Sequence, residues 1–142
     1  MTSTYNLKRF LDAQENNYAQ ALAEIRRGRK QGHWMWYIFP QISGLGYSET
    51  AKFYAVQDLN EAGAYLAHPT LGSRLIDISD AFLGIDGRSA NAILGSPDDL
   101  KMKSSMTLFS LLPNTDPVFR AVLGKFFSGS QDEKTLVIIK NR

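Results

Sequence analysis

The segment from His33 to Gln41 concentrates aromatic side chains, among them both tryptophans of the chain, and two glycines follow shortly after it. Large aromatic rings stack on flat ligands such as purines or nicotinamide, and glycines let backbone amides approach a ligand closely. Apolar side chains at this density also pack into cores, so the segment is either the wall of a pocket or part of the core. As a pocket wall, its ligand-binding residues would be Trp34, Trp36, Gly44 and Gly46.

A second group of polar side chains lies between residues 98 and 107. If this stretch is helical, Asp99 and Lys103 are four residues apart, as are Lys101 and Ser105, so each pair can meet on the helix surface. Hydroxyls and lysines together suit a phosphate or a ribose. The alternative is a solvated helix face without a ligand, whose hydroxyls donate hydrogen bonds to the carbonyls of their own helix. The candidate ligand-binding residues here are Lys101, Lys103, Ser104, Ser105 and Thr107.

The motifs of several known site classes are missing from the sequence. There is no Walker phosphate loop and no serine nucleophile elbow, and Gly44-Leu45-Gly46 lacks the third glycine and the preceding strand of a dinucleotide fingerprint. With two histidines and no cysteine, the chain offers neither a histidine-rich nor a thiolate metal site, which leaves only carboxylate magnesium sites open. We expect no metal and no cofactor.

The charge of the chain gives little reason to expect a polyanionic partner. Its formal net charge is +2, and the one basic cluster, Arg26, Arg27, Arg29 and Lys30, ends a predicted helix, where cations complement the helix dipole. We therefore expect no nucleic-acid partner.

The N-terminus, from Met1 to Arg9, is polar, and no apolar run approaches the roughly 20 residues that cross a bilayer. We expect a cytoplasmic protein without membrane contact, and the absence of cysteine is compatible with that.

The elements that must position these residues follow from composition and period. Apolar residues make up 44% and charged residues 21%, a globular balance that excludes a disordered chain or a fibre. A chain of 142 residues buries enough surface to fold without a disulfide. We expect a single compact domain over residues 1–142.

Helical spacing and capping signals recur along the whole chain. Residues 7–28 form two helices that break at Asn16 or Asn17, or one continuous helix, and we favour two. The clearest stripe begins with Pro69 and carries Leu71, Leu75, Ile78 and Phe82. Thr135–Lys140 is β-branched enough for a strand, but no partner strand is predicted, so we assign a helix. The sequence predicts an all-α fold of seven to nine short helices, the others within 48–54, 58–68, 89–95, 96–112 and 116–129.

Taken in order, four segments resemble the domain of unknown function 1810 family. They are the aromatic segment, residues 48–54, Tyr65-Leu66-Ala67-His68-Pro69 and residues 101–109. Within them, His33-Trp34-Met35-Trp36 and Ser104-Ser105-Met106-Thr107-Leu108-Phe109 are specific to the family, and the match runs from about Leu7 to Leu136. The resemblance implies a small bacterial protein with a mainly α-helical fold and no established activity. Some members carry the label calpastatin, but calpastatins are long, repetitive and disordered, and this unrepeated chain does not resemble them.

A looser likeness, of helical architecture and of a polar and aromatic pocket, is to enzymes that cleave N-glycosidic bonds of ADP-ribose or riboside intermediates. Hydrolysis of that kind needs an acid or base near the sugar, for which Asp98, Asp99 or His33 could serve. The sequence singles out none of the three and leaves open whether the chain is an enzyme.

We expect a pocket between residues 33–46 and the 101–107 helix that binds a phosphorylated nucleotide-like molecule. Whether the pocket also hydrolyses this molecule stays open. The alternative is a non-enzymatic protein-interaction module with the aromatic segment as core or contact patch. The oligomeric state stays open.

Overall fold

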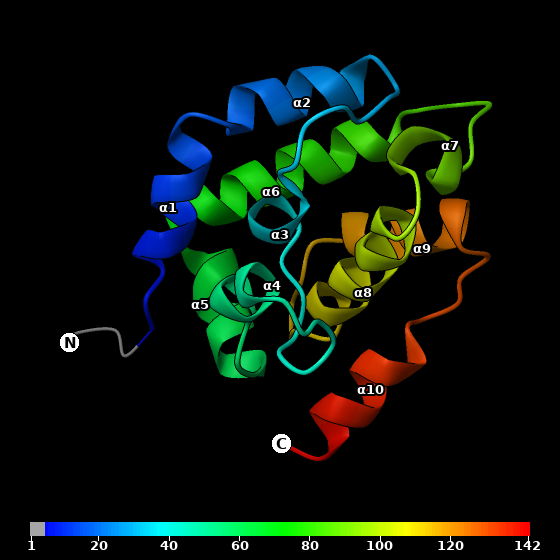
Figure 1. Ribbon diagram of the computed structural model, residues 1–142. Helices are drawn as coiled ribbons and strands as arrows, with labels where there is room; N and C mark the ends of the chain where they lie inside the picture. Colours follow the sequence, from blue (N-terminus) through cyan, green and yellow to red (C-terminus); the bar gives the residue numbers. More distant parts are fainter. Residues whose placement is uncertain (1–4) are drawn as a thin grey trace.

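The computed structural model describes residues 5–142, and this part of the chain folds into ten α-helices without a β-strand (Figure 1). The polar N-terminal segment noted in the sequence runs from Met1 to Arg9, and its first four residues lie outside the described residues. The helices are α1 (Lys8–Glu15), α2 (Tyr18–Arg26), α3 (Met35–Ile38), α4 (Glu49–Tyr54), α5 (Leu59–Ala67), α6 (Pro69–Leu83), α7 (Ala90–Leu94), α8 (Asp98–Ser110), α9 (Val118–Phe126) and α10 (Glu133–Lys140). Among residues 5–142, no helix is both long enough and apolar enough to span a bilayer.

The all-α prediction is confirmed, with one helix more than expected. The additional element is α3, a single turn inside the aromatic segment. A helix of four residues is too short to show a helical period, and all four of its side chains are apolar or aromatic. The N-terminal region forms two helices, α1 and α2, as we favoured. Residues 133–140 are helical rather than extended, and the Asp132 carboxylate caps α10 by accepting a bond from the Thr135 N–H at 3.0 Å.

Helix α8 lies in the middle of the molecule and packs against α5, α7, α9 and α10 (Figure 1). Every residue from Ser104 to Ser110 is buried. This stretch of the helix has no polar face, so its hydroxyls have only partners within the fold, and Ser105 Oγ has none among the described residues. Thr107 Oγ1 donates to the Lys103 carbonyl at 2.8 Å and accepts from the Asp132 N–H at 2.9 Å, which ties α8 to the start of α10.

The corner between α5 and α6 is built from a cap and a glycine. His68 Nδ1 accepts from the N–H groups of Thr70 and Leu71 at 3.1 and 3.3 Å, and so caps α6. A Cβ on Gly72 would lie 1.9 Å from the Leu66 carbonyl oxygen, so only glycine allows the two helices to approach this closely. The apolar stripe predicted for α6 is confirmed, because each of its members is fully or almost fully buried: Leu71, Leu75, Ile78 and Phe82.

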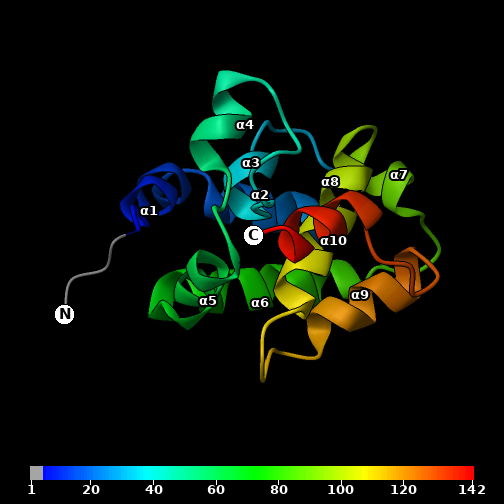
Figure 2. The ribbon, with the colours of Figure 1, turned by 90° about the horizontal axis from the view of Figure 1, so that it is seen from below.

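An arginine at the N-terminus holds the segment that carries α4. Arg9 donates to the carbonyls of Phe53 and Ala55 at 2.8 and 2.9 Å, and its guanidinium pairs with Glu61 at 3.1 Å. An isolated parallel bridge between Ile42 and Val56 joins the two ends of the segment, residues 43–55, that contains α4. Together these contacts place α4 on the opposite side of the molecule from α9, as Figure 2 shows.

Candidate functional site

The two segments singled out in the sequence meet in space along one groove. The groove has a volume of about 630 Å³, within the range of small-molecule pockets, and lies between residues 41–51, the first half of α8 and the start of α10. Its apolar lining includes Leu45 and Leu100, and the Leu100 side chain is 60% exposed although it lies on the central helix. Its polar and charged lining comes from Gln41, Lys101, Lys103, Ser104, Ser130, Gln131, Asp132, Glu133 and Lys134.

A chain of alternating charges and rings joins the aromatic segment to the N-terminal end of α8. Lys101 Nζ lies 4.9 Å from the centroid of the Trp36 ring, and Lys30 Nζ lies 5.1 Å from that of Trp34. Both ammonium groups share the carboxylate of Asp98, at 3.5 Å from Lys101 and 2.9 Å from Lys30. Lysine heads that face an aromatic ring and a carboxylate at once are held in place, so Lys101 is fixed at the edge of the groove.

Trp34 is oriented by a buried carboxylate. Glu24 is 1% exposed, and its Oε1 accepts bonds from the N–H groups of Gln31 and Gly32 and from the Trp34 indole at 2.7, 2.8 and 3.0 Å. Burial by itself would raise the pKa of Glu24. The donors, joined by the Gln20 amide, favour the charged form more strongly and lower the pKa to about 2. Glu24 is therefore an ionised anchor for the loop that leads into the aromatic segment.

The electrostatics of the groove favour an anion. Lys103 and Lys134 form no ion pair within residues 5–142, and the contact of Lys101 with Asp98 is long. The Asp132 carboxylate on the same lining is engaged by both the N–H and the hydroxyl of Thr135. Three lysines therefore face the groove together with two carboxylates, those of Asp132 and Glu133, so the lining carries an excess of one positive charge. Lysine heads of this kind bind phosphate or carboxylate.

The predicted site residues fall into two groups. Gly46, Lys101, Lys103 and Ser104 line the groove, and Trp36 borders it through Lys101. Trp34, Ser105 and Thr107 are at most 1% exposed and are not part of the lining of this groove, because all three are buried inside the fold. Gly44 lies beside α10, where a Cβ would approach Ile138 at 3.3 Å.

The three predicted acid or base candidates are also separated. Asp98 is held between two lysines, and Asp99 accepts the Leu100 N–H at 2.9 Å in the first turn of α8. His33 is exposed and lines a different, shallow hollow, which it shares with Phe53 and other residues of α3 and α4. In residues 5–142, no three His, Cys, Asp or Glu side chains gather where a metal ion could be held.

Several groove residues were absent from the sequence-based site. Gln41 is the last residue of the aromatic segment, and its place in a predicted pocket wall was the available signal. Gln131 and Lys134 lie 24 and 27 residues after Thr107, and the Thr107–Asp132 hydrogen bond ties their segment back to α8. No local pattern in the sequence predicts that return.

The arrangement is thus an all-α protein with a lysine-lined groove beside its central helix. The chain belongs to the family described as "Protein of unknown function (DUF1810)", which matches residues 4–139, so the predicted family is confirmed. It is similar to the conserved hypothetical protein Rv1873 from Mycobacterium tuberculosis, known from a crystal structure, at 43% sequence identity and a TM-score of 0.95. That likeness covers 97% of this chain and 99% of the other. No curated protein matches the chain.

Proposed function

We propose that the groove binds a small molecule that carries phosphate groups, of the nucleotide or ADP-ribose type. The observation that carries this proposal is the convergence of Lys101, Lys103 and Lys134 on one groove, where they outnumber the two lining acids, Asp132 and Glu133. Lys103 and Lys134 form no ion pair among the described residues. Phosphate oxygens are the ligands that such lysine heads bind most readily. The groove is also large enough for a nucleotide-sized molecule.

The apolar side of the groove supports a ligand with a flat or apolar part. Leu45 and the exposed Leu100 offer surface for it, and Trp36 is half-buried beside Lys101. Ser104 lines the groove, but its hydroxyl already donates to the Leu100 carbonyl at 3.1 Å, so it serves a ligand only as an acceptor.

Hydrolysis of the bound molecule is a further possibility, and fewer contacts in the groove support it than support binding. A general base must reach the water that it activates, and Asp98 is the candidate nearest to the lysines of the groove. Because both of its oxygens face ammonium groups, it is better suited to hold Lys101 than to accept a proton. We therefore propose binding first, with hydrolysis to be tested only on a ligand that binds.

The experiment is a thermal-shift screen against nucleotides, ADP-ribose, NAD and sugar phosphates. A ligand at 100 times its Kd adds about 2.7 kcal/mol of stability, which raises the melting temperature clearly. A rise with phosphorylated compounds, and none with the matching unphosphorylated nucleosides, supports the proposal. A flat panel overturns it.

One observation favours the alternative, a protein-interaction module. Tyr47 and Phe53 are 84% and 55% exposed, although large apolar side chains usually contribute to a core. Under that alternative, a Tyr47→Ser/Phe53→Ser variant loses a protein partner while the ligand panel stays flat in the wild type. A positive panel that is unchanged in this variant favours the groove.

A further inference from the structure

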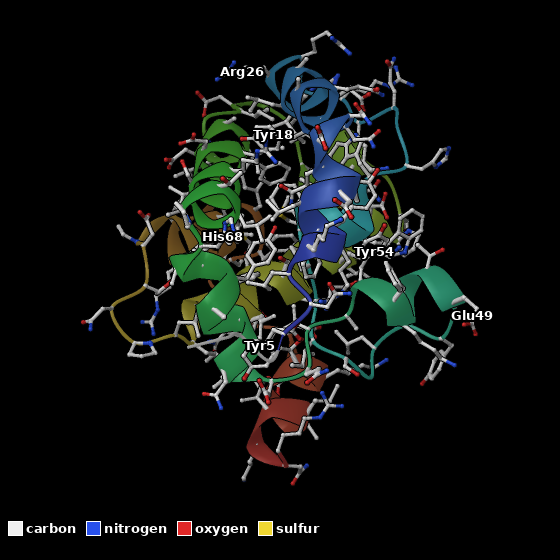
Figure 3. The ribbon with its side chains drawn as sticks, turned by 90° about the vertical axis from the view of Figure 1, so that its left-hand side faces the viewer. Tyr5, Tyr18, Arg26, Glu49, Tyr54 and His68 are labelled. Atoms are coloured by element: carbon white, nitrogen blue, oxygen red, sulfur yellow. The ribbon has the colours of Figure 1, made fainter. Side chains whose placement is uncertain are left out.

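Four arginine side chains gather where α2 ends. Arg26, Arg27 and Arg29 flank the turn at Gly28, and all three are exposed. Arg88 comes from the loop between α6 and α7 and is exposed as well; its Cδ lies 3.5 Å from the position that a Cβ on Gly28 would take. We call these four residues the arginine patch. Figure 3 shows Arg26 at the end of α2, on the outside of the molecule.

The positive charge of the arginine patch is not neutralised by the fold. No ion pair within residues 5–142 involves any of its four members. Among the neighbouring acids, Asp86 pairs with Lys125 at 2.7 Å, and the buried Glu24 carboxylate accepts backbone N–H groups. Asp77, on the adjacent helix α6, is exposed and forms no ion pair within residues 5–142. The four exposed arginines therefore have no ion-pair partner among the described residues.

The helix dipole accounts for only a small part of this cluster. The C-terminus of a helix is equivalent to about half an elementary negative charge, whereas the arginine patch carries four positive ones. The whole chain has a net charge of +2, so the remaining side chains together are net negative. Positive potential is thus concentrated at this one end of α2.

We propose that the arginine patch binds a short acidic segment of a protein partner, independently of the groove. Each guanidinium is a planar fork that can bind a carboxylate through two parallel hydrogen bonds, and a few neighbouring Asp or Glu side chains suffice to occupy the four forks. Long-range attraction between unlike charges also accelerates such an encounter.

Size and surroundings argue for an acidic peptide rather than a nucleic acid. A nucleic-acid strand that neutralises six to ten phosphates would have to extend beyond four arginines onto a surface that is net negative as a whole. Binding of single strands also uses aromatic rings beside the cations. Among the described residues, the ring–cation contacts involve Arg9, Lys30, Arg74, Lys101 and Lys125, and no member of the arginine patch.

The test is fluorescence anisotropy with a fluorescein-labelled glutamate peptide of about eight residues, at low salt and at roughly 150 mM salt. The variant Arg27→Glu/Arg88→Glu reverses two charges of the arginine patch. The control Lys52→Glu/Lys140→Glu makes the same change of net charge at exposed positions on α4 and α10. We expect a loss of affinity of about tenfold or more in the first variant and less than about twofold in the second.

Three results overturn the proposal: no binding by the wild type, an equal loss in both variants, or tighter binding of a single-stranded oligonucleotide of equal charge than of the peptide. The second would indicate attraction by net charge alone, and the third a nucleic-acid site. Equal melting temperatures of the two variants establish that the comparison is between folded proteins.

Discussion

The ammonium group of Lys101 lies 4.9 Å from the centre of the Trp36 ring, and this contact joins two segments that are 65 residues apart. It fixes a lysine of the central helix against the aromatic segment, at the border of the groove. The aromatic residues thus have two roles: Trp34 completes the core, whereas Trp36 supports a charge.

Replacing Arg9 by alanine should destabilise the protein by about 3 to 5 kcal/mol. The change leaves the buried Glu61 carboxylate without its cation and the carbonyls of Phe53 and Ala55 without their donor. Urea unfolding measures the loss. Lys8→Ala, which breaks the exposed pair with Asp12, is the matched control and should cause no measurable change. Similar losses in both variants would contradict the structural role of Arg9.

Two glycine-to-alanine variants should change stability in opposite directions. Gly72→Ala places a methyl group against the Leu66 carbonyl at the α5–α6 corner and should cost about 3 kcal/mol or more. Gly124→Ala, in α9, meets no atom within 4 Å and should add about 0.5 to 1 kcal/mol, because alanine is the better helix former. Thermal unfolding of both variants measures the difference. A stable Gly72→Ala protein would show that the two helices are not this close.

Acid should weaken the protein through Glu24. Its pKa falls from an ordinary 4.5 to about 2 on folding, so the ionised carboxylate stabilises the folded state above pH 4.5, and this contribution is lost as the pH drops toward 2. The full contribution is at most about 3 kcal/mol. Unfolding free energies between pH 2 and 6 should therefore fall less steeply in Glu24→Gln than in the wild type. Parallel curves would mean that Glu24 does not hold the loop.

Two hydroxyls of α8 should respond differently to removal. Ser105 Oγ is buried without a hydrogen-bond partner among the described residues, so Ser105→Ala should raise stability by about 1 kcal/mol and leave ligand affinity unchanged. Thr107→Val removes a hydroxyl that bonds both Lys103 and Asp132, and should cost about 1 to 3 kcal/mol. A ligand role for Ser105 requires the opposite result, which is loss of binding at constant stability. Calorimetric melting curves and ligand titrations of the two variants separate these cases.

The helices could be predicted because their signals are local. Ser48, Asp58 and Ser89 each accept a hydrogen bond from the N–H three residues ahead and so cap α4, α5 and α7. The apolar stripe of α6 likewise repeats within a single helix. A helix boundary needs no knowledge of the rest of the chain.

The candidate site could be predicted only in part, because exposure is set by the tertiary fold. The spacing of Ser105 and Thr107 on a polar helix gave no sign that the helix would be covered on every side. Lys103 and Ser104 precede them by only a few residues and line the groove, because the first half of α8 emerges from the core there. Lys134 reaches the groove through a return of the chain that no local pattern encodes.

The central claim is that the lysines of the groove bind a phosphorylated small molecule, and isothermal titration calorimetry tests it most directly. The ligand is the strongest compound of the thermal-shift screen, or ADP-ribose if several are equal. It is titrated into the wild type, Lys101→Ala/Lys103→Ala and the control Lys52→Ala/Lys140→Ala, whose lysines lie outside the groove lining. We expect the groove variant to lose affinity by about tenfold or more at an unchanged melting temperature, and the control to bind like the wild type. Equal affinity in all three proteins, or no binding by the wild type, would contradict the claim.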